Sequence, residues 1–270
     1  MAKQPSLVPS PGKKVRLKDY NPSDNGDCKN ETDAEELIEK DLKRLRDLQE
    51  VLYADRGHAL LVVLQGIDAG GKDGTINHVF RGLNPQGVVV TSFKQPTGEE
   101  LAHDFLWRIH KRVPEKGYIG VFNRSHYEDV LVVRVHNLVD KKVWKTRYDQ
   151  INQFEEMLAE NGTTILKFFL YISKDEQKKR FEARRDDPQK RWKFALGDLQ
   201  ERQLWDDYQE AFDDMLSKCN TDYAPWTIVP ANHKWYRNLV VTRTIVETLE
   251  KLDLKYPSPV ENIEKVVIPD

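Results

Sequence analysis

Residues 58–75 read HALLVVLQGIDAGGKDGT, and this segment decides the fold. Residues 60–64 form an unbroken apolar run, which is typical of a strand buried on both faces. Residues 66–72 then follow the spacing G-x-x-x-x-G-K of a phosphate-binding loop. Glycines let such a loop turn sharply and direct its N–H groups inward, and a helix that begins near Lys72 adds its positive dipole end. The order of strand, loop and helix therefore predicts a phosphate site.

Two carboxylates distinguish this loop from the usual one. Asp68 lies inside it, and Asp73 stands where Ser or Thr normally ligates Mg²⁺. A bare carboxylate 4 Å from a phosphate charge is repelled by about 1 kcal/mol in water, and by more where water is excluded. A bridging Mg²⁺ removes that repulsion, because Mg²⁺ binds one or two carboxylates together with substrate phosphates. The alternatives are that Asp68 accepts hydrogen bonds from loop amides and that Asp73 caps the helix.

Composition limits the partners. The chain has 270 residues, of which 39% are hydrophobic and 32% charged, with a net charge of −2. This balance supports a proper core and excludes a globally basic nucleic-acid binder, so any polyanion must be held by a local patch. Cys28 and Cys219 form neither a metal spacing nor a disulfide framework, which favours the cytoplasm. No signal peptide and no apolar run of about 18 residues is present, so no membrane partner is expected.

Alternating strands and helices predict an α/β fold with a parallel five-stranded sheet, covered on both faces in three layers. We expect an extended or partly disordered N-terminal arm at 1–30, a single domain at 31–256 with a helical lid at about 174–198, and an irregular tail at 257–270. The expected strands are 60–64, 87–93 (also buried), 117–122, 164–172 and 226–229. The expected helices are 32–53, 72–81, 99–112, 125–138, 142–160, 199–217 and 234–252. The leucine stripe of the first helix indicates packing onto the domain or a subunit contact.

Ligands of such sheets bind at the carboxyl ends of the strands. That rule groups five polar residues around one crevice: Asp68, Lys72, Lys94, Asn123 and Arg124. Asn123 and Arg124 are the second and third residues of the motif FNRSHYEDVLVVR at 122–134. Arg124 suits a bidentate clamp on phosphate.

The same motif holds two acidic residues with alternative roles. Ser125 and Glu128 have the S-x-x-E spacing of a capping box. Asp129 either faces the crevice, where it binds metal or accepts a proton, or is a solvated acid in the first helical turn. His126 is expected to be a packing or surface residue.

A basic segment follows the fourth expected strand. Residues 174–193 contain nine Lys and Arg against five Asp and Glu, and the DDP sequence at 186–188 ends the helix. A mobile arginine-bearing lid is what phosphoryl transfer needs, because it stabilises charge and excludes water. Salt-bridged surface helices have a similar composition, so that alternative stays open.

Several motifs carry a resemblance to a known family: GIDAGGKDGT (66–75), SFKQPT (92–97), FLWRIH (105–110), GVFNRSHYEDVLV (120–132) and RWKF (191–194). They resemble the second family of polyphosphate kinases, most closely its third class, whose members have Glu at the position of Glu128. The resemblance implies a thymidylate-kinase-like P-loop kinase fold and reversible transfer of a phosphoryl group between inorganic polyphosphate and AMP or ADP. It also implies Mg²⁺, or Mn²⁺ in its place, adenine and secondarily guanine nucleotides, and a homo-oligomer.

Roles follow from the resemblance position by position. The catalytic residues would be Asp68, Lys72, Arg124 and Asp129, with Asp68 and Asp129 binding the metal. Glu128 would bear on whether a monophosphate is accepted. The substrate- and phosphate-binding set would comprise Gly66, Ala69, Gly70, Gly71, Asp73, Gly74, Lys94, Asn123, Glu128, Arg134, Arg180 and Arg184.

Two rival functions remain at this point. An ATP-dependent kinase of a nucleoside monophosphate or other small acceptor would use the same loop and lid. A nucleotide-sensing protein without turnover would need the cradle but would gain nothing from carboxylates inside it.

Overall fold

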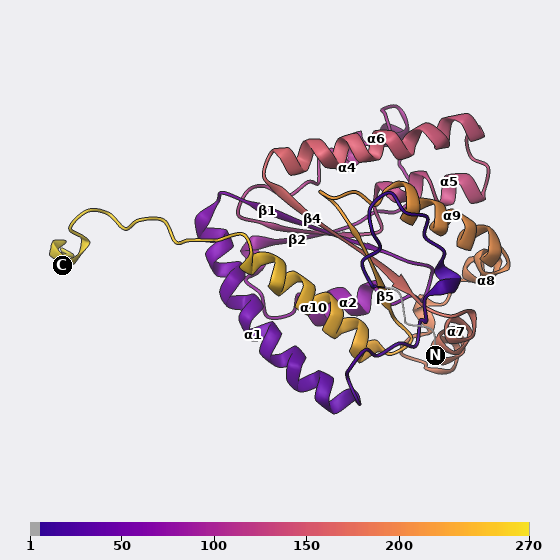
Figure 1. Ribbon diagram of the computed structural model, residues 1–270, viewed down its shortest axis with the longest axis horizontal. Coiled ribbons are helices and arrows are strands. Elements are labelled where there is room, and N and C mark those ends of the chain that lie inside the picture. Colours follow the sequence, from indigo (N-terminus) through magenta and orange to yellow (C-terminus); the bar gives the residue numbers. More distant parts are fainter. Residues whose placement is uncertain (1–5, 270) are drawn as a thin grey trace.

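The computed structural model describes residues 6–269, so residues 1–5 of the expected arm and Asp270 of the expected tail lie outside it. The described chain forms one five-stranded sheet in the order β2-β3-β1-β4-β5, and every pairing in it is parallel (Figure 1). The strands are β1 (Ala59–Gln65), β2 (Val88–Ser92), β3 (Ile119–Asn123), β4 (Thr163–Tyr171) and β5 (Trp226–Pro230). The predicted α/β fold with a parallel five-stranded sheet is confirmed.

Helices cover both faces of this sheet. The helices α1 (Glu31–Asp55), α2 (Lys72–Val79) and α10 (Lys234–Glu250) lie on one face, and α6 (Lys141–Glu160) and α9 (Trp205–Lys218) lie on the other (Figure 1). The shorter helices are α3 (Gly98–Leu101), α4 (Trp107–His110), α5 (Val132–Val135), α7 (Lys174–Asp186) and α8 (Leu196–Gln203). The 3₁₀ turns are η1 (Leu17–Asp19), η2 (Pro85–Gly87), η3 (His126–Asp129), η4 (Arg191–Lys193) and η5 (Ile263–Lys265). Within residues 6–269, no helix has the length and apolar character needed to span a bilayer.

The central strand β1 positions the phosphate loop. All seven of its residues are buried, as the apolar run predicts, and it pairs with β3 on one side and β4 on the other. Leu64 is in register with Asn123, so the segments that follow β1 and β3 leave the sheet side by side. The polar residues that follow these two strands are therefore brought to the same edge of the sheet, as predicted.

The strand predicted at 87–93 is present as β2, but the prediction that it is buried is wrong. The strand β2 lies at the sheet edge and pairs only with β3, and Val89 and Val90 are each 47% exposed. Apolar character alone does not distinguish an edge strand from a central one.

Three predicted helices are interrupted. The helix expected at 99–112 is two single turns, α3 and α4, because the Asp104 carboxylate accepts the Leu106 N–H at 3.0 Å and begins a new turn. The helix expected at 125–138 is η3 followed by α5, and the one expected at 199–217 is divided at Leu204 between α8 and α9. In the first two cases the apolar spacing is helical, but side chains bonded locally or to the core break the backbone ladder. Nothing in the structure explains the break at Leu204.

The N-terminal arm is extended and bonded to the domain over its described part. The Val15 N–H donates to Ser217 Oγ at 2.8 Å, the Leu17 N–H donates to Asp213 at 2.8 Å, and the Ile228 N–H donates to Leu7 O at 2.8 Å. The stripe of α1 packs against α10 through Ile38 and Leu42, in agreement with the packing interpretation. The chain beyond α10 leads away from the domain (Figure 1).

A buried polar network lies beneath the segment that follows β3. The Lys167 ammonium on β4 donates to Glu155 Oε2 at 2.6 Å, to the Tyr127 hydroxyl at 2.8 Å and to Cys219 O at 2.7 Å. The other Glu155 oxygen accepts the Tyr127 O–H at 2.8 Å and lies 3.1 Å from His126 Nε2. Burial acts against ionisation, but Lys167 and His126 outweigh it and lower the pKa of Glu155. The network therefore fastens His126 and Tyr127, and with them the backbone next to Arg124.

We expect Lys167→Met to lower the free energy of unfolding by about 3–5 kcal/mol, because it leaves the Glu155 carboxylate buried without its cation. The double variant Lys167→Met with Glu155→Leu should recover most of that loss, since no buried charge remains. Urea denaturation of the wild type and both variants measures this. A double variant no more stable than the single one would contradict the assignment of the loss to an uncompensated charge.

Candidate active site

The backbone of the phosphate loop is held in a shape that suits glycine. Gly66 has φ 151° and Gly71 has φ 107°, and a Cβ at Gly66 would come within 2.7 Å of Leu170 O. Ala69 also adopts a positive φ, of 62°, which few non-glycine residues do. The Gly70 N–H closes a turn onto Ile67 O at 2.9 Å. The loop therefore curls at the end of β1 and leads into α2 at Lys72.

The Lys72 side chain folds back into this loop. Its ammonium donates to Gly66 O at 2.7 Å and to Ile67 O at 3.3 Å, and the residue is 8% exposed. Burial, followed by repulsion from Arg124, lowers the pKa of Lys72 to about 8, although Asp68 opposes the change. Two carbonyl oxygens are weak partners for an ammonium, so a phosphate that entered the loop would be a stronger one.

Arg124 lies opposite Lys72 and is held by two carboxylates. One of its terminal nitrogens donates to Asp68 Oδ1 at 2.5 Å, and the other donates to Glu128 Oε2 at 3.4 Å. Arg124 itself has φ 62°, and its N–H donates to Leu64 O at 3.1 Å, so its backbone is tied to the end of β1. Burial acts against its charge, but Glu128 and Asp68 outweigh burial and raise the pKa of Arg124.

The capping box predicted from Ser125 and Glu128 is not formed. Ser125 Oγ accepts the Tyr127 N–H at 3.2 Å, and the Glu128 carboxylate is turned to Arg124. The ion pair with Arg124 engages the Glu128 carboxylate that the capping box would have needed.

Asp73 and Asn123 complete this side of the site. The Asn123 amide donates to Asp73 Oδ1 at 2.7 Å, which links the first turn of α2 to the end of β3. Asp73 is exposed, and so is Lys94 beyond β2. Of the five residues expected to group, Asp68, Lys72, Asn123 and Arg124 thus meet at one edge of the sheet, with Asp73 added through Asn123. Among the described residues, no hydrogen bond or ion pair joins the Lys94 side chain to them.

The helix α7 closes over the loop from the other side. Gln177 donates to Asp68 O at 2.9 Å, and Arg180 donates to Ala69 O at 2.9 Å and to Gly70 O at 3.0 Å. Arg180 also reaches Ala231 O and pairs with Glu176 at 2.7 Å. The donors of Arg180 are occupied by protein oxygens. Arg180 therefore supports the loop and is not free to bind phosphate. Gln177 gave no signal in the sequence beyond its place in the basic helix.

Arg184 lies near Asp198, an acidic residue at the end of the expected lid. It lies 3.8 Å from Asp198 of α8. Burial and the nearby Asp68 raise the pKa of Asp198. The charge of Asp68 therefore acts on Asp198. No motif in the sequence indicates that Asp198 belongs to this site.

Asp129 and Arg134 are placed differently from the residues above. Asp129 is 8% exposed, pairs with Arg147 at 3.1 Å and lies 4.0 Å from Arg108. Burial raises the pKa of Asp129 despite these cations. Arg134 is held by Glu210 at 2.5 Å and Asp214 at 2.6 Å on α9. Arg134 joins α5 to α9 through these pairs, so its guanidinium is engaged by carboxylates rather than directed to the phosphate loop.

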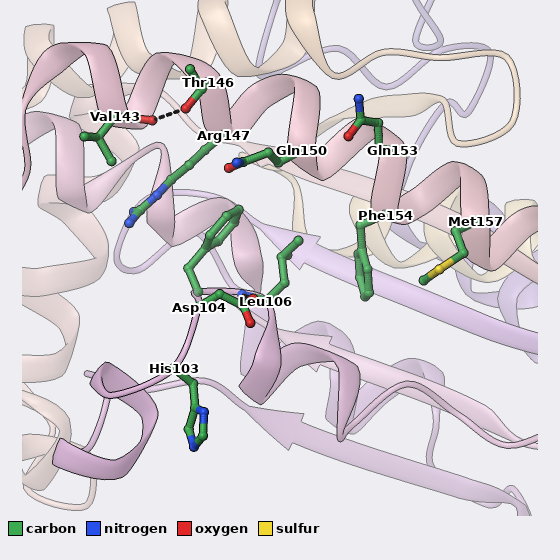
Figure 2. A pocket seen from close by; sticks show the side chains of 11 residues that line it. His103, Asp104, Leu106, Val143, Thr146, Arg147, Gln150, Gln153, Phe154 and Met157 are labelled. Atoms are coloured by element: carbon green, nitrogen blue, oxygen red, sulfur yellow. Dashed lines mark hydrogen bonds between the residues drawn. The ribbon is translucent and has the colours of Figure 1, made fainter.

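A hollow lies next to Arg147, away from the phosphate loop. A cavity of about 660 Å³ separates α6 from the segment after α3, and Figure 2 shows Arg147, Phe154 and Met157 of α6 facing Asp104 and Leu106 across it. The Lys72 side chain occupies the loop itself, where its ammonium contacts Gly66 O and Ile67 O.

A divalent metal fits the loop only with help from substrate. Among residues 6–269, no three His, Cys, Asp or Glu side chains gather as a metal site. Asp68 uses one carboxylate oxygen for Arg124, and the other has no such ion pair. Mg²⁺ commonly takes one or two carboxylates and fills its remaining positions with phosphate oxygens and water, and this donor set suits that pattern.

A glycine-bent loop between a parallel strand and a helix, with Lys72 inside it and Arg124 across from it, defines a phosphate-loop kinase or related phosphotransferase. The sequence profile of the family described as Polyphosphate kinase 2 (PPK2) matches residues 28–257, and the chain belongs to that family. It is 60% identical over 226 residues to an AMP/ADP-polyphosphate phosphotransferase of Meiothermus ruber, covering 84% of this chain and 85% of that protein.

Two further comparisons agree. An ADP-polyphosphate phosphotransferase of Rhodopseudomonas palustris is 50% identical over 234 residues, which cover 82% of this chain and 81% of that protein. The crystal structure of polyphosphate kinase 2 from Arthrobacter aurescens TC1 superimposes with a TM-score of 0.93 at 44% identity, covering 97% of this chain and 95% of that one. The family resemblance seen in the motifs is confirmed.

We expect kcat/KM for phosphate transfer to fall above about pH 8, because Lys72 loses its proton there in the free protein. The kcat itself should fall at a higher pH, since a bound phosphate raises the pKa of Lys72. The free protein should become more stable between about pH 8 and 10.5, where the unfolded chain still binds the proton that the folded chain has lost. A kcat/KM that stays level up to pH 10 would contradict the role of Lys72.

Proposed function

We propose that the chain transfers a terminal phosphoryl group reversibly between inorganic polyphosphate and AMP or ADP, with a divalent metal. This proposal rests on one observation: Lys72 and Arg124 lie at the same phosphate loop. Lys72 is held there by backbone carbonyls and Arg124 by carboxylates, and phosphate oxygens can replace both kinds of partner. An oxygen of the nucleotide's terminal phosphate attacks the end phosphorus of polyphosphate, and the bridging P–O bond behind it breaks. The polyphosphate chain leaves one unit shorter.

The residues act by positioning and by stabilising charge. The loop amides and Lys72 hold the phosphoryl group, and Lys72 exchanges the carbonyls of Gly66 and Ile67 for phosphate oxygens. Arg124 approaches from β3 and exchanges Asp68 and Glu128 for the equatorial oxygens of the transferred group. Mg²⁺, or Mn²⁺ in its place, held by Asp68 would neutralise phosphate charge.

Specificity and assembly belong to the same proposal. Glu128, held at Arg124, governs whether a monophosphate is accepted, and adenine nucleotides are the main acceptors. Lys94 and Arg184 provide cations at the approach to the site. The working form is a cytoplasmic homo-oligomer, in keeping with the free thiols of Cys28 and Cys219.

An ATP-dependent kinase of a small acceptor is the second candidate. It would use the same loop, but the relatives described above are named for polyphosphate together with AMP or ADP, and their names do not give ATP as a donor. A sensor without turnover is less compatible with Asp68, because a binding cradle is weakened by a carboxylate of its own.

The decisive assay mixes the chain with polyphosphate, Mg²⁺ and either ADP or AMP and measures ATP or ADP formed. Lys72→Ala should lower kcat/KM by about a thousandfold or more, the range of losing a charge-stabilising group at the reacting phosphate. Lys145→Ala, on the exposed side of α6, is the matched control and should retain wild-type rates. Transfer from ATP but never from polyphosphate would favour the second candidate.

The metal role of Asp68 has its own test. Chelation should stop transfer, and Asp68→Asn should raise the Mg²⁺ concentration needed for half-maximal rate by about tenfold, because one charged ligand is lost. Glu128→Gln, assayed with ADP, is the control, since it also loosens Arg124 but removes no proposed ligand. Equal Mg²⁺ dependence in the wild type and Asp68→Asn would show that Asp68 serves only to hold Arg124.

A further inference from the structure

Arg237 is a buried cation beside the phosphate loop that no step above uses. It lies in the first turn of α10, directly after β5, and is 3% exposed. Its guanidinium rests against the start of α2: a Cβ at Gly71 would collide with Nη1, and a Cβ at Gly74 would lie 3.5 Å from Nη2. Glycine at position 71 makes room for this contact, whereas a Cβ at position 74 would meet the guanidinium at an ordinary van der Waals distance.

The charge of Arg237 has no counterion among the described residues. Its Nε and Nη2 groups donate to the neutral Asn238 Oδ1, at 3.1 and 2.8 Å, and no carboxylate lies within ion-pair distance. By contrast, Arg124 has two carboxylates, and Arg180 has Glu176 and several carbonyl oxygens. Arg237 is therefore the exception among the guanidinium groups that surround the loop.

Its surroundings make this charge more costly. Arg180 Nη1 lies 3.4 Å from the position that a Gly71 Cβ would occupy, so two guanidinium groups flank the same residue. The positive end of the α2 dipole adds to the repulsion. Burial, followed by Arg180, lowers the pKa of Arg237 to about 10. A group that served only to fill space between α10 and α2 would be better without charge.

We propose that Arg237 is a further anion-binding residue of the phosphate site, whose charge is balanced when a polyphosphate chain occupies the loop. This rests on the proposed function for the identity of the anion. The free protein carries the repulsion between Arg237, Arg180 and the helix end, and bound phosphate removes it. Part of the affinity for polyphosphate thus comes from a charge placed behind the loop backbone.

This inference predicts a signature that packing residues do not have. In Arg237→Gln, the affinity for inorganic tripolyphosphate with Mg²⁺ should fall by about 10- to 100-fold, the range expected for losing one partly shielded attraction between charges across the loop backbone. The thermal midpoint of the free variant should equal or exceed that of the wild type, because an unbalanced charge has gone. Arg237→Lys keeps the charge and should recover most of the affinity. Calorimetric titration and thermal unfolding of the full chain measure both.

The same helix offers a matched control. Arg243 on α10 is 40% exposed in its side chain and pairs with Asp41 at 3.1 Å, so Arg243→Gln removes the same charge from a balanced site. That variant should bind tripolyphosphate as the wild type does. If Arg237→Gln does not fold, Arg237→Met, of similar length and without charge, takes its place.

The outcomes separate this inference from the proposed function. Unchanged tripolyphosphate affinity in Arg237→Gln would overturn it, as would a loss of affinity that comes with a lower midpoint and is not recovered by Arg237→Lys. If the wild type binds tripolyphosphate through Arg237 but transfers no phosphoryl group to a nucleotide, the proposed function fails and the anion-binding role of Arg237 stands.

Discussion

The ion pair between Asp68 and Arg124 ties together the two strands that create the site. Asp68 follows β1 and Arg124 follows β3, and the strands are neighbours in the sheet. In the free protein each charge satisfies the other, so the loop can keep a carboxylate in a region built for anions. A phosphate that displaces Asp68 from Arg124 frees a carboxylate next to phosphate oxygens, where a divalent metal is most stable. In the mechanism we propose, one exchange of partners would therefore link substrate binding to metal binding.

The sequence predicts the sheet well because its strands are apolar and its turns carry strong signals. The segment at 60–64 is buried on both faces, as its composition requires, and all five strands lie where they were expected. Helix continuity is predicted poorly. At 125–138 the apolar spacing indicates one helix, but His126 and Tyr127 are drawn into the network around Lys167. A lysine within an apolar strand carries no visible sign of the partners that keep it buried.

Local motifs predict the centre of the site, and distant contacts decide the rest. Lys72 and Arg124 can be placed from loop spacing and strand ends alone. Arg180 looked like a phosphate ligand because it belongs to a basic helix, but its donors are engaged by the loop carbonyls. Arg237 was missed for the opposite reason: it stands alone in an ordinary helix, and only the fold brings it to Gly71. The density of charged residues along the chain is thus a poor guide to which cations bind phosphate, because it favours Arg180 and gives no weight to Arg237.

The placement of charge suggests why the loop is framed by helices from far apart in the chain. Loop amides can hold one phosphate group, but a polyanion needs cations on more than one side. Helices α7 and α10 both begin where a strand ends, at the same edge of the sheet as the loop. Each helix therefore places an arginine against the backbone of the loop. These arginines contact backbone and glycine, which leaves the inner surface of the loop to the substrate. The fold can therefore hold strong positive charge behind the loop, while Lys72 remains inside it, where in the mechanism we propose it would move with the phosphate.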